Sequence, residues 1–471
     1  MWKLGPIQLL TIIGSFYYLG VIFGMLFMIV LSQVAHYVLS RMGYEIFRFN
    51  DITHVIQEDS KTFSNIVVYM EIDKLDADTL KKHVYSKDVI NVRRVNQGIT
   101  NKFGFCLWKD LPKEQCASQV KKCTKNIDNE QGIVEFCNEL ITTKMDYDKP
   151  LWEMHVLENY SSEKSIIFVR VHHAFSDGVG FVSFISCLLD KPYSLSMKKK
   201  FVQNSFISEA FYTLFGPIYA IHCTNKLKAL SSDSQGGKVT ETTEEQRQPD
   251  KIFLSKEFSF KSVVKCYKRF DKTTFNDYML AAVSTGFDKW LKQNSIKDAK
   301  KIVVSMPVNV RPLPTKIEEL KLGNYFMATR CELPLHSTIE KSIYSCKEAF
   351  WSIYSEAMIR SMDKLGNLLR FIPQQIAFQA ADDVFKGIGL ALSNIPFGQE
   401  DWVICNKKVH KRGFWTHNQL SLKLFMFVIT YGDKMTVTLS ANKTLKLDAK
   451  QFIDAVESSI ENDINENCKQ E

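Results

Sequence analysis

The alternation of apolar and polar residues divides the first part of the chain into short strands and amphipathic helices. Runs rich in β-branched and aromatic residues predict strands at 64–72, 151–158 and 165–171, and a polar turn joins the last two. Apolar residues spaced three and four apart predict helices at 76–85 and 132–145, the first with a capping signal. After the third strand the pattern becomes helical again, so the stretch "VHHAFSDGVG" lies where a strand passes into a helix.

The second part of the chain repeats this alternation without an obvious internal sequence repeat. Its predicted elements are a helix with Asn276 and Asp277 at its start, strands at 301–310 and 323–333, long helices at about 338–362 and 367–385, a hairpin that turns at Gly432 and Asp433, and a closing helix at 448–463. Strands and helices alternating in both parts indicate an α/β protein with two mixed α/β halves.

The N-terminus carries no charged residue between Lys3 and His36. A bilayer core needs about 20 apolar residues, so this run predicts a membrane anchor that spans once, or a re-entrant hairpin that bends at its glycines. The run is too long for a signal peptide. Arg41 and Arg48 after it, against Lys3 before it, favour a body on the cytosolic side.

Residues 196–251 break the pattern and indicate a connector between the halves. A basic run, Lys198 to Lys200, precedes the apolar segment 209–223, which suits either a buried helix broken at Pro217 or a segment lying in a membrane interface. The polar stretch 231–250 is predicted to be disordered. The predicted division is a membrane anchor (1–45), an N-terminal subdomain (46–195), the connector (196–251) and a C-terminal subdomain (252–471).

Composition narrows the classes of function. The 471 residues, 45% of them hydrophobic, are enough to bury sizeable cores. The formal net charge of +8 is modest and no zinc-finger signature occurs, so no nucleic-acid partner is expected; an anionic lipid surface or anionic cofactor fits better. The eleven cysteines form no C-x-x-C pair and are odd in number, which favours reduced thiols in a cytosol-like compartment.

His172 and His173 stand at the end of a strand that is predicted to be buried. Neighbouring residues of a strand point to opposite faces, so one histidine is expected to pack inside while the other faces a cleft. Gly178 removes a side chain where the backbone turns, and the helix that follows offers free N–H groups. Asp177 is expected to cap that helix or to hold an arginine that shapes the loop.

This arrangement suits general-base catalysis. A neutral imidazole can take a proton from a hydroxyl group as its oxygen attacks an acyl carbon, with further donors for the developing oxyanion. The chain has no G-x-S-x-G elbow, which favours direct transfer from a bound donor over a covalent acyl-enzyme. A structural core histidine is the alternative. No metal site is expected, because the spacing lacks the i, i+4 histidine pair of a zincin helix.

The segment "HHAFSDG" matches the H-H-x-x-x-D-G signature of the acyltransferase superfamily that includes chloramphenicol acetyltransferase-like folds and peptide-synthetase condensation domains. Over residues 46–465, apart from the polar connector, the chain resembles the wax ester synthase/diacylglycerol acyltransferase family. Six shorter segments occur in the order of that family: "FNDITHVIQEDS" (49–60), "PLWEMHVLE" (150–158), "FNDYMLAAV" (275–283), "MPVNVR" (306–311), "LGN" (322–324) and "SNIPFG" (393–398).

The resemblance implies two chloramphenicol acetyltransferase-like mixed-sheet subdomains with a tunnel between them, to which an N-terminal transmembrane segment would be added. Acyl-CoA, a co-substrate rather than a permanently bound cofactor, and a lipid alcohol would meet at a histidine in the tunnel. His173 would be the general base, His172 would support it, and Asp177 would shape the loop. Asn276 would donate to the acceptor or the oxyanion, or would cap its helix.

Further roles follow from the same resemblance. Ser393, Asn394 and Pro396 would form a loop lining the cleft, and Arg311 would be the partner of Asp177. Phe397 departs from the family, which has a glycine after the proline. A local change in the loop or a narrower tunnel is therefore expected. Trp152 and Pro150 are expected to pack in the core.

The implied function is that of a membrane-anchored O-acyltransferase, which transfers a fatty acyl group from acyl-CoA to a long-chain alcohol or diacylglycerol in wax ester or triacylglycerol synthesis. An amine or sterol acceptor stays open. The alternative is a catalytically idle family member that serves as a structural subunit of a larger membrane protein complex. The expected location is the endoplasmic reticulum or a lipid droplet, with a cytosolic catalytic domain; another organelle membrane fits as well.

Overall fold

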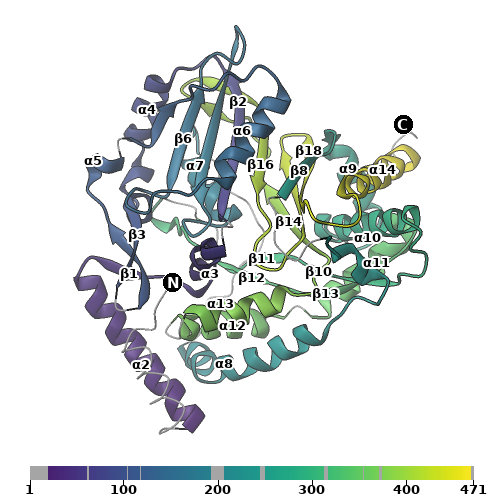
Figure 1. Cartoon of the computed structure of the whole chain (residues 1–471), viewed down its shortest axis with the longest axis horizontal. Helices are drawn as coiled ribbons and strands as arrows, with labels where there is room; N and C mark the ends of the chain where they lie inside the picture. Colours follow the sequence, from purple (N-terminus) through teal and green to yellow (C-terminus); the bar gives the residue numbers. More distant parts are fainter. Residues whose placement is uncertain are drawn as a thin grey trace.

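The computed structural model shows an α/β chain built around two mixed β-sheets (Figure 1). It describes residues 20–467 apart from 61–62, 103, 117, 193–205, 244–249, 312–313, 315–316, 354 and 371–373. One six-stranded sheet belongs mainly to the first half of the sequence and one seven-stranded sheet to the second half. The predicted α/β class with two mixed-sheet halves is therefore confirmed.

The first sheet carries the strand that leads to the double histidine. Its order is β15-β16-β2-β7-β6-β5, and β7 is antiparallel to both neighbours. Val67 and Phe168 pack under α6, whereas Val68 and Val169 pack under α4 and α7. Because helices cover both faces, the whole of β7 after Lys164 is buried. The bounds are β2 (Asn65–Asp73), β5 (Val120–Lys122), β6 (Trp152–Leu157), β7 (Lys164–His172), β15 (Val403–Ile404), β16 (Lys407–Thr416), α4 (Ala77–Ser86), α6 (Glu130–Thr142) and α7 (Gly178–Leu188).

The second sheet has the order β13-β10-β14-β17-β18-β8, with β9 beside β18. The central strand β14 runs parallel to both β10 and β17. The helices α10, α11 and α14 bury their apolar faces against this sheet. The bounds are β8 (Asp250–Leu254), β9 (Phe258–Ser259), β10 (Lys301–Ser305), β13 (Cys331–Pro334), β14 (Leu390–Pro396), β17 (Leu424–Tyr431), β18 (Lys434–Asn442), α9 (Phe260–Lys268), α10 (Phe275–Gln293), α11 (Ile339–Trp351) and α14 (Ala449–Asn467).

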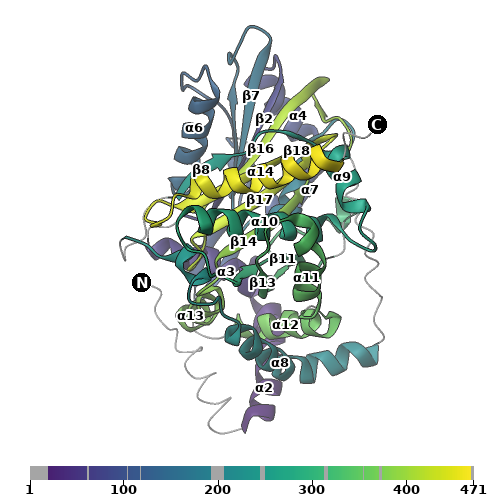
Figure 2. The ribbon, with the colours of Figure 1, turned by 90° about the vertical axis from the view of Figure 1, so that its right-hand side faces the viewer.

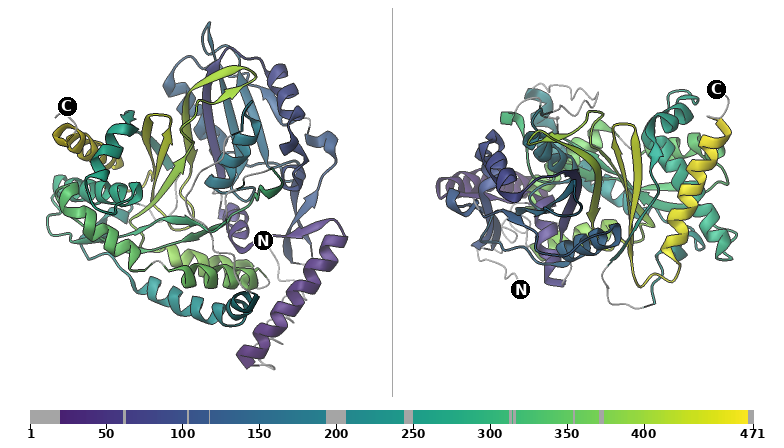
Figure 3. Two further views of the ribbon diagram at one scale, coloured as in Figure 1. Left: turned by 180° about the vertical axis from the view of Figure 1, so that it is seen from behind. Right: turned by 90° about the horizontal axis from the view of Figure 1, so that it is seen from above.

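The remaining elements form two small sheets and several further helices. Figures 1 and 2 show α2, α8, α12 and α13 at one end of the molecule, and Figure 3 shows the same end from behind. These elements are β1 (Tyr44–Ile46), β3 (Gln97–Lys102) and β4 (Phe105–Asp110) in one small sheet, β11 (Pro307–Asn309) and β12 (Phe326–Ala328) in another, and the helices α2 (Gly20–Arg41), α3 (Phe49–Ile56), α5 (Lys113–Cys116), α8 (Phe206–Ala229), α12 (Glu356–Leu369) and α13 (Gln374–Phe385).

Strand β16 interlocks the two halves. The chain leaves the second sheet after β14, forms β15 and β16 at the edge of the first sheet, and returns to the second sheet as β17. β16 pairs antiparallel with β2, with Val409 opposite Ile72 at one end and Thr416 opposite Ile66 at the other. The first sheet thus contains residues that the predicted division assigns to a C-terminal subdomain (252–471). The boundaries themselves stay a prediction.

Three predicted features of individual elements are wrong. The pattern at 338–362 covers two helices, α11 and α12, because the side chain of Ser355 accepts a hydrogen bond from the amide of Met358 (3.2 Å) and starts a new helix. Helix α8 continues through Pro217 instead of breaking there. In the stretch 231–250, a short 3-10 helix at Gly236–Thr240 buries Val239, so this part is ordered.

The predicted membrane anchor lies partly outside the described residues, which begin at residue 20. Helix α2 is the described part, and near its C-terminal end Leu39 packs with Ile46 and Leu107 of the three-stranded sheet. None of the helices in the described ranges has the length and apolar character that crossing a membrane requires. The expected transmembrane segment is therefore not found there.

Gly413 in β16 leaves no room for a side chain where this strand pairs with β2 of the first sheet. A Cβ atom there would press against the rings of Tyr69 and Trp415. We expect Gly413→Ala to lower the free energy of unfolding by about 1–3 kcal/mol, because buried rings cannot shift without repacking.

Gly237→Ala is the matched control, since no atom lies within 4 Å of a Cβ at that position. Thermal and denaturant unfolding of both variants measure the difference. Equal stability of Gly413→Ala and Gly237→Ala would show that β16 is not closely packed in the first sheet.

Candidate active site

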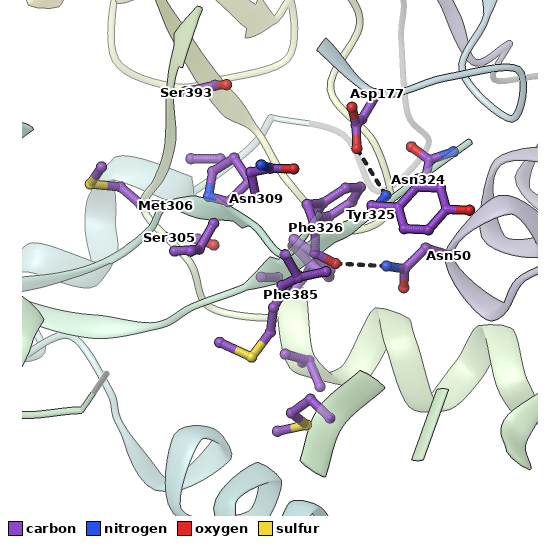
Figure 4. A pocket seen from close by; sticks show the side chains of 18 of the residues that line it. Asn50, Asp177, Ser305, Met306, Asn309, Asn324, Tyr325, Phe326, Phe385 and Ser393 are labelled. Atoms are coloured by element: carbon purple, nitrogen blue, oxygen red, sulfur yellow. Dashed lines mark hydrogen bonds between the residues drawn. The ribbon is translucent and has the colours of Figure 1, made fainter. Parts of the chain in front are cut away.

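A cavity of about 750 Å³ lies where the two halves meet (Figure 4). The first half contributes His173 and Asp177 to its wall, and the second half contributes Asn324 and Ser393. Helices α8, α12 and α13 add residues from the end of the molecule described above. Apolar side chains also face the cavity, among them Met306, Phe326, Phe385, Leu422 and Phe427.

The two histidines occupy different environments, as the alternation along a strand predicts. His172 ends β7, is fully buried, and donates its backbone N–H to the carbonyl of Leu151 (3.0 Å). His173 donates its N–H to the carbonyl of Ser64 (2.6 Å), and its side chain lines the cavity. Only the second histidine can meet a bound molecule.

Hydrogen bonds fix the ring of His172 inside the core. Its Nδ1 accepts from the backbone N–H of Ala174 (3.1 Å), so its Nε2–H donates to Glu58 (2.9 Å). Tyr147 donates its hydroxyl to the other oxygen of Glu58 (2.6 Å). Burial raises the pKa of Glu58, but His172 and these donors outweigh it and bring the pKa below its usual value. His172 therefore anchors the strand end below the cavity.

Asn324 sets which nitrogen of His173 carries the proton. Its side-chain N–H₂ donates to Asp51 (2.9 Å) and to the carbonyl of His173 (2.7 Å), so its Oδ1 is the atom that faces His173 Nδ1 at 2.9 Å. An acceptor at that distance requires Nδ1 to be the protonated nitrogen. In the described residues Nε2 of His173 makes no hydrogen bond, and it keeps its lone pair for a proton.

Burial keeps the imidazole of His173 neutral. Loss of solvation lowers its pKa from 6.5 to about 4, although the charge of Asp177 acts in the opposite direction. The ring of His54 stacks on it, with centroids 3.9 Å apart and planes 15° apart. Burial and the nearby His173 also hold the pKa of His54 well below its usual value. Both rings are therefore uncharged at neutral pH.

Asp177 holds the loop after the histidines in place. One carboxylate oxygen caps α7 by accepting from the amide of Gly180 (3.0 Å), and the other accepts from Arg311 and from the amide of Tyr325 (2.9 Å; Figure 4). Arg311 also donates to the carbonyl of Lys321 (2.6 Å). Both roles expected for Asp177, the cap and the pairing with Arg311, are thus present in one carboxylate.

The glycine on which the loop depends is Gly180. A Cβ on Gly180 would approach Ser176 and would lie 2.6 Å from Arg311, whereas a Cβ on Gly178 would make ordinary contact with Ile395 at 3.4 Å. Gly178 lines the cavity, but the space it leaves is not essential to the turn. The H-H-x-x-x-D-G pattern points to Gly178, whereas the closer packing is at Gly180.

Asn276 lies in the cavity wall inside the first turn of α10. The cap of that helix is Thr274, which forms a capping box with Asp277, so the expectation that Asn276 caps the helix is wrong. The Oδ1 of Asn276 accepts from Asn394 (3.0 Å), and its N–H₂ group has no hydrogen-bond partner among the described residues.

Ser393, Asn394 and Pro396 line the cavity as expected, but they lie in strand β14 and not in a loop. Phe397 follows the strand, is fully buried, and packs on Trp402 with ring centroids 5.2 Å apart. The positive φ of 84° falls on Gly398. The phenylalanine therefore does not narrow the cavity.

Gln419 is a cavity residue that was not predicted from the sequence. It is 9% exposed, and its amide nitrogen has no hydrogen-bond partner among the described residues. The amide of the next residue, Leu420, donates to Gln57 (3.2 Å), which in turn contacts Ser64 near the histidines. The available signal was that Gln419 lies in a polar stretch directly after the strand β16. No local pattern shows that the loop holding this residue lies close to the histidines.

Other classes of site find less support in the described ranges. No group of three or more His, Cys, Asp or Glu side chains there could hold a metal ion. The cysteines within these ranges are free thiols, and burial raises the pKa of Cys187 to about 11. The thiol of that residue is therefore a poor nucleophile at neutral pH.

Comparison with known proteins agrees with the geometry. Residues 128–206 match the wax ester synthase/diacylglycerol acyltransferase catalytic domain, and residues 322–462 match the C-terminal domain of the same family. Wax ester synthase/diacylglycerol acyltransferase 1 of Arabidopsis thaliana is 27% identical over 377 residues, which cover 71% of this chain and 76% of the relative. Wax ester synthase/diacylglycerol acyltransferase 11 of the same plant is 24% identical over 188 residues, which cover 36% of this chain and 39% of the relative. The match thus spans well under half the length of the second relative.

Two solved structures have a similar fold. The wax ester synthase/diacylglycerol acyltransferase from Marinobacter aquaeolei VT8 superposes with a TM-score of 0.58 at 13% identity, covering 90% of this chain and 99% of that chain. The starter condensation domain of rhizomide synthetase RzmA, in complex with C8-CoA and Leu-SNAC, gives a TM-score of 0.62 at 11% identity, covering 91% and 96%. At these identities the similarity concerns the fold alone.

The protonation state of His173 can be read by NMR on histidine-labelled protein. We expect the Nδ1–H tautomer and a ring that gains its second proton only near pH 4, because burial opposes the charged form. His173→Gln assigns the signal, and Asn324→Ala should mix the two tautomers. A ring that carries its proton on Nε2, or that titrates at 6.5 or above, would contradict this assignment.

The Asp177–Arg311 pair can be tested by unfolding. Arg311→Met leaves a buried carboxylate without its main partner, and we expect a loss of about 3–5 kcal/mol in the free energy of unfolding. The double variant Asp177→Asn/Arg311→Met should be less destabilised than the two single variants added together. Strictly additive losses in denaturant titrations would show that the two side chains do not interact.

Proposed function

Because this chain belongs to the wax ester synthase/diacylglycerol acyltransferase family, we propose that it transfers a fatty acyl group from acyl-CoA to the hydroxyl of a long-chain alcohol or diacylglycerol. The observation that carries the proposal is the unprotonated Nε2 of His173 on the wall of the cavity. The proposal covers the reaction and not a mode of membrane anchoring.

His173 acts as the general base in this reaction. Its Nε2 takes the hydroxyl proton while the acceptor oxygen attacks the thioester carbonyl. The tetrahedral oxyanion then collapses, the carbon–sulfur bond breaks, and the leaving thiolate takes the proton back from the imidazolium. The products are an oxoester and CoA, and no acyl-enzyme forms. Asn324 accepts from Nδ1 throughout, which supports the imidazolium while it exists.

One amide group of the cavity wall is a candidate donor to the oxyanion or the acceptor. Asn276 lines the cavity, and among the described residues its N–H₂ group has no hydrogen-bond partner. A donor aimed at a developing oxyanion is worth about 10²–10³ in kcat. Asp177 is occupied by Arg311 and two backbone amides, so it shapes the loop and does not take the proton.

The wall of the cavity suits a hydrocarbon chain. Phe326, Phe385 and Phe427 face it, and each buried methylene group of a ligand gains about 0.8 kcal/mol. The alternative, an idle structural subunit of a membrane complex, would be favoured by a cavity filled with side chains. The open space beside His173 favours an active enzyme over an idle subunit. We place the reaction at the cytosolic face of the endoplasmic reticulum or at lipid droplets, where such acceptors dissolve.

An acceptor panel tests the proposal directly. Purified protein with labelled acyl-CoA is offered hexadecanol, a diacylglycerol, a sterol and a long-chain amine. We expect ester formation with hexadecanol or diacylglycerol, and we expect His173→Ala to lower kcat by about 10²–10⁴.

His410→Gln is the control, because that histidine pairs with Asp73 (2.7 Å) and is no part of the cavity wall. It should keep the full rate. Wild-type protein that forms no ester with any acceptor would contradict the proposal, and so would unchanged turnover in His173→Ala.

A further inference from the structure

Helix α8 presents an apolar face that the rest of the described chain does not cover. Its inner face packs closely on α12, where Gly216 lets the helix approach Ser361: a Cβ on the glycine would lie only 3.3 Å from the serine Cα. The outer face follows helical spacing, and each of its side chains is at least 43% exposed. These residues are Phe211, Leu214, Phe215, Ile218 and Ile221.

Helix α2 presents a second face of the same kind. Phe23, Phe27, Val30, Val34 and Tyr37 recur at intervals of three and four residues, and each is at least 42% exposed. Figures 1 and 2 show α2 and α8 at the same end of the molecule, and α12 contacts both helices. We call these ten residues the α2–α8 surface. Exposed apolar area gathered on two neighbouring helices marks an interaction site.

The charges around this surface favour lipid as the occupant. Residues 20–40 of α2 and 210–225 of α8 contain no Asp, Glu, Lys or Arg. The charged residues that follow them along the two helices are basic, namely Arg41, Lys226 and Lys228. Glu209, which precedes the apolar part of α8, pairs with Lys364 (2.7 Å). Apolar faces bordered by cations fit an anionic headgroup layer over hydrocarbon.

The surface is also continuous with the cavity. Ile221 is half exposed on the outer face of α8 and at the same time lines the cavity. Farther along α8, Thr224, Leu227 and Lys228 line it as well. Helix α8 therefore belongs both to the exposed apolar face and to the cavity wall.

We propose that the α2–α8 surface docks the protein on a phospholipid-covered lipid surface, with both helices lying in the interface. The cavity then opens toward the lipid beside Ile221. Docking goes beyond the proposed acyl transfer and does not depend on it. Entry of the acceptor beside Ile221 rests on that proposed function.

Flotation of the full-length purified chain with liposomes tests docking without any turnover. The liposomes are phosphatidylcholine with about one-fifth phosphatidylserine, and pure phosphatidylcholine serves for comparison. We expect the wild type to float, more strongly with the anionic lipid. Phe211→Glu and Phe27→Glu should each weaken binding by about tenfold or more, and the double variant should weaken it further.

Leu254→Glu is the matched control, because Leu254 is 41% exposed on β8, away from the α2–α8 surface. It should float like the wild type, and so should His173→Ala. The Phe27, Phe211 and Leu254 variants are checked by thermal unfolding and by turnover of a short, water-soluble alcohol, which should be unchanged because none of these three residues lines the cavity. His173→Ala is checked by thermal unfolding alone.

Three results would overturn docking on lipid. The first is a wild type that stays at the bottom of the gradient, and the second is equal flotation of the Phe211→Glu/Phe27→Glu variant. The third is a double variant that floats like the wild type but is a monomer where the wild type is a dimer. That result would show that the α2–α8 surface is a contact between two copies of this chain. Flotation of a protein that forms no ester would keep the docking surface and reject the acyl transfer.

Discussion

The hydrogen bond between His173 Nδ1 and Asn324 Oδ1 is the interaction on which the rest of the site depends. It joins the two halves, since His173 follows β7 of the first sheet and Asn324 precedes β12 of the second half. Asp51 holds the amide of Asn324 from the other side. This single contact sets the tautomer, so it decides whether a lone pair or an N–H meets the substrate. Without the contact between the two halves, nothing would fix which nitrogen of His173 carries the proton.

Several supports of this contact could be predicted from sequence because they are local. The strand that ends at His172 and the helix that Asp177 caps follow from short-range patterns. The pairing of Asp177 with Arg311 is not local, and only the family resemblance implied it. The stacking of His54 on His173 was not, because it depends on where α3 is packed by the whole fold. The insertion of β16 into the first sheet is likewise a long-range event that no local pattern encodes. The same limit explains Phe397, whose burial against Trp402 could not be read from its neighbours.

Burial of the histidines has a cost as well as a use. Low solvation keeps His173 and His54 uncharged, which provides a base in the right form but lowers its strength. The proton that His173 accepts during turnover must therefore be supported, and Asn324 and the charge of Asp177 are placed to do so. A cavity with many apolar side chains in its wall and a base that needs support are consistent with a reaction of fatty substrates.

The most direct measurement is a crystal structure with CoA and a long-chain alcohol bound together. The account predicts the alcohol oxygen within about 2.6–3.2 Å of His173 Nε2, the reach of a general base. It also predicts that Nδ1 stays on Asn324 and that the alkyl chain lies along the apolar wall toward α8. An alcohol bound elsewhere, or a His173 ring turned so that Nδ1 faces the hydroxyl, would contradict it.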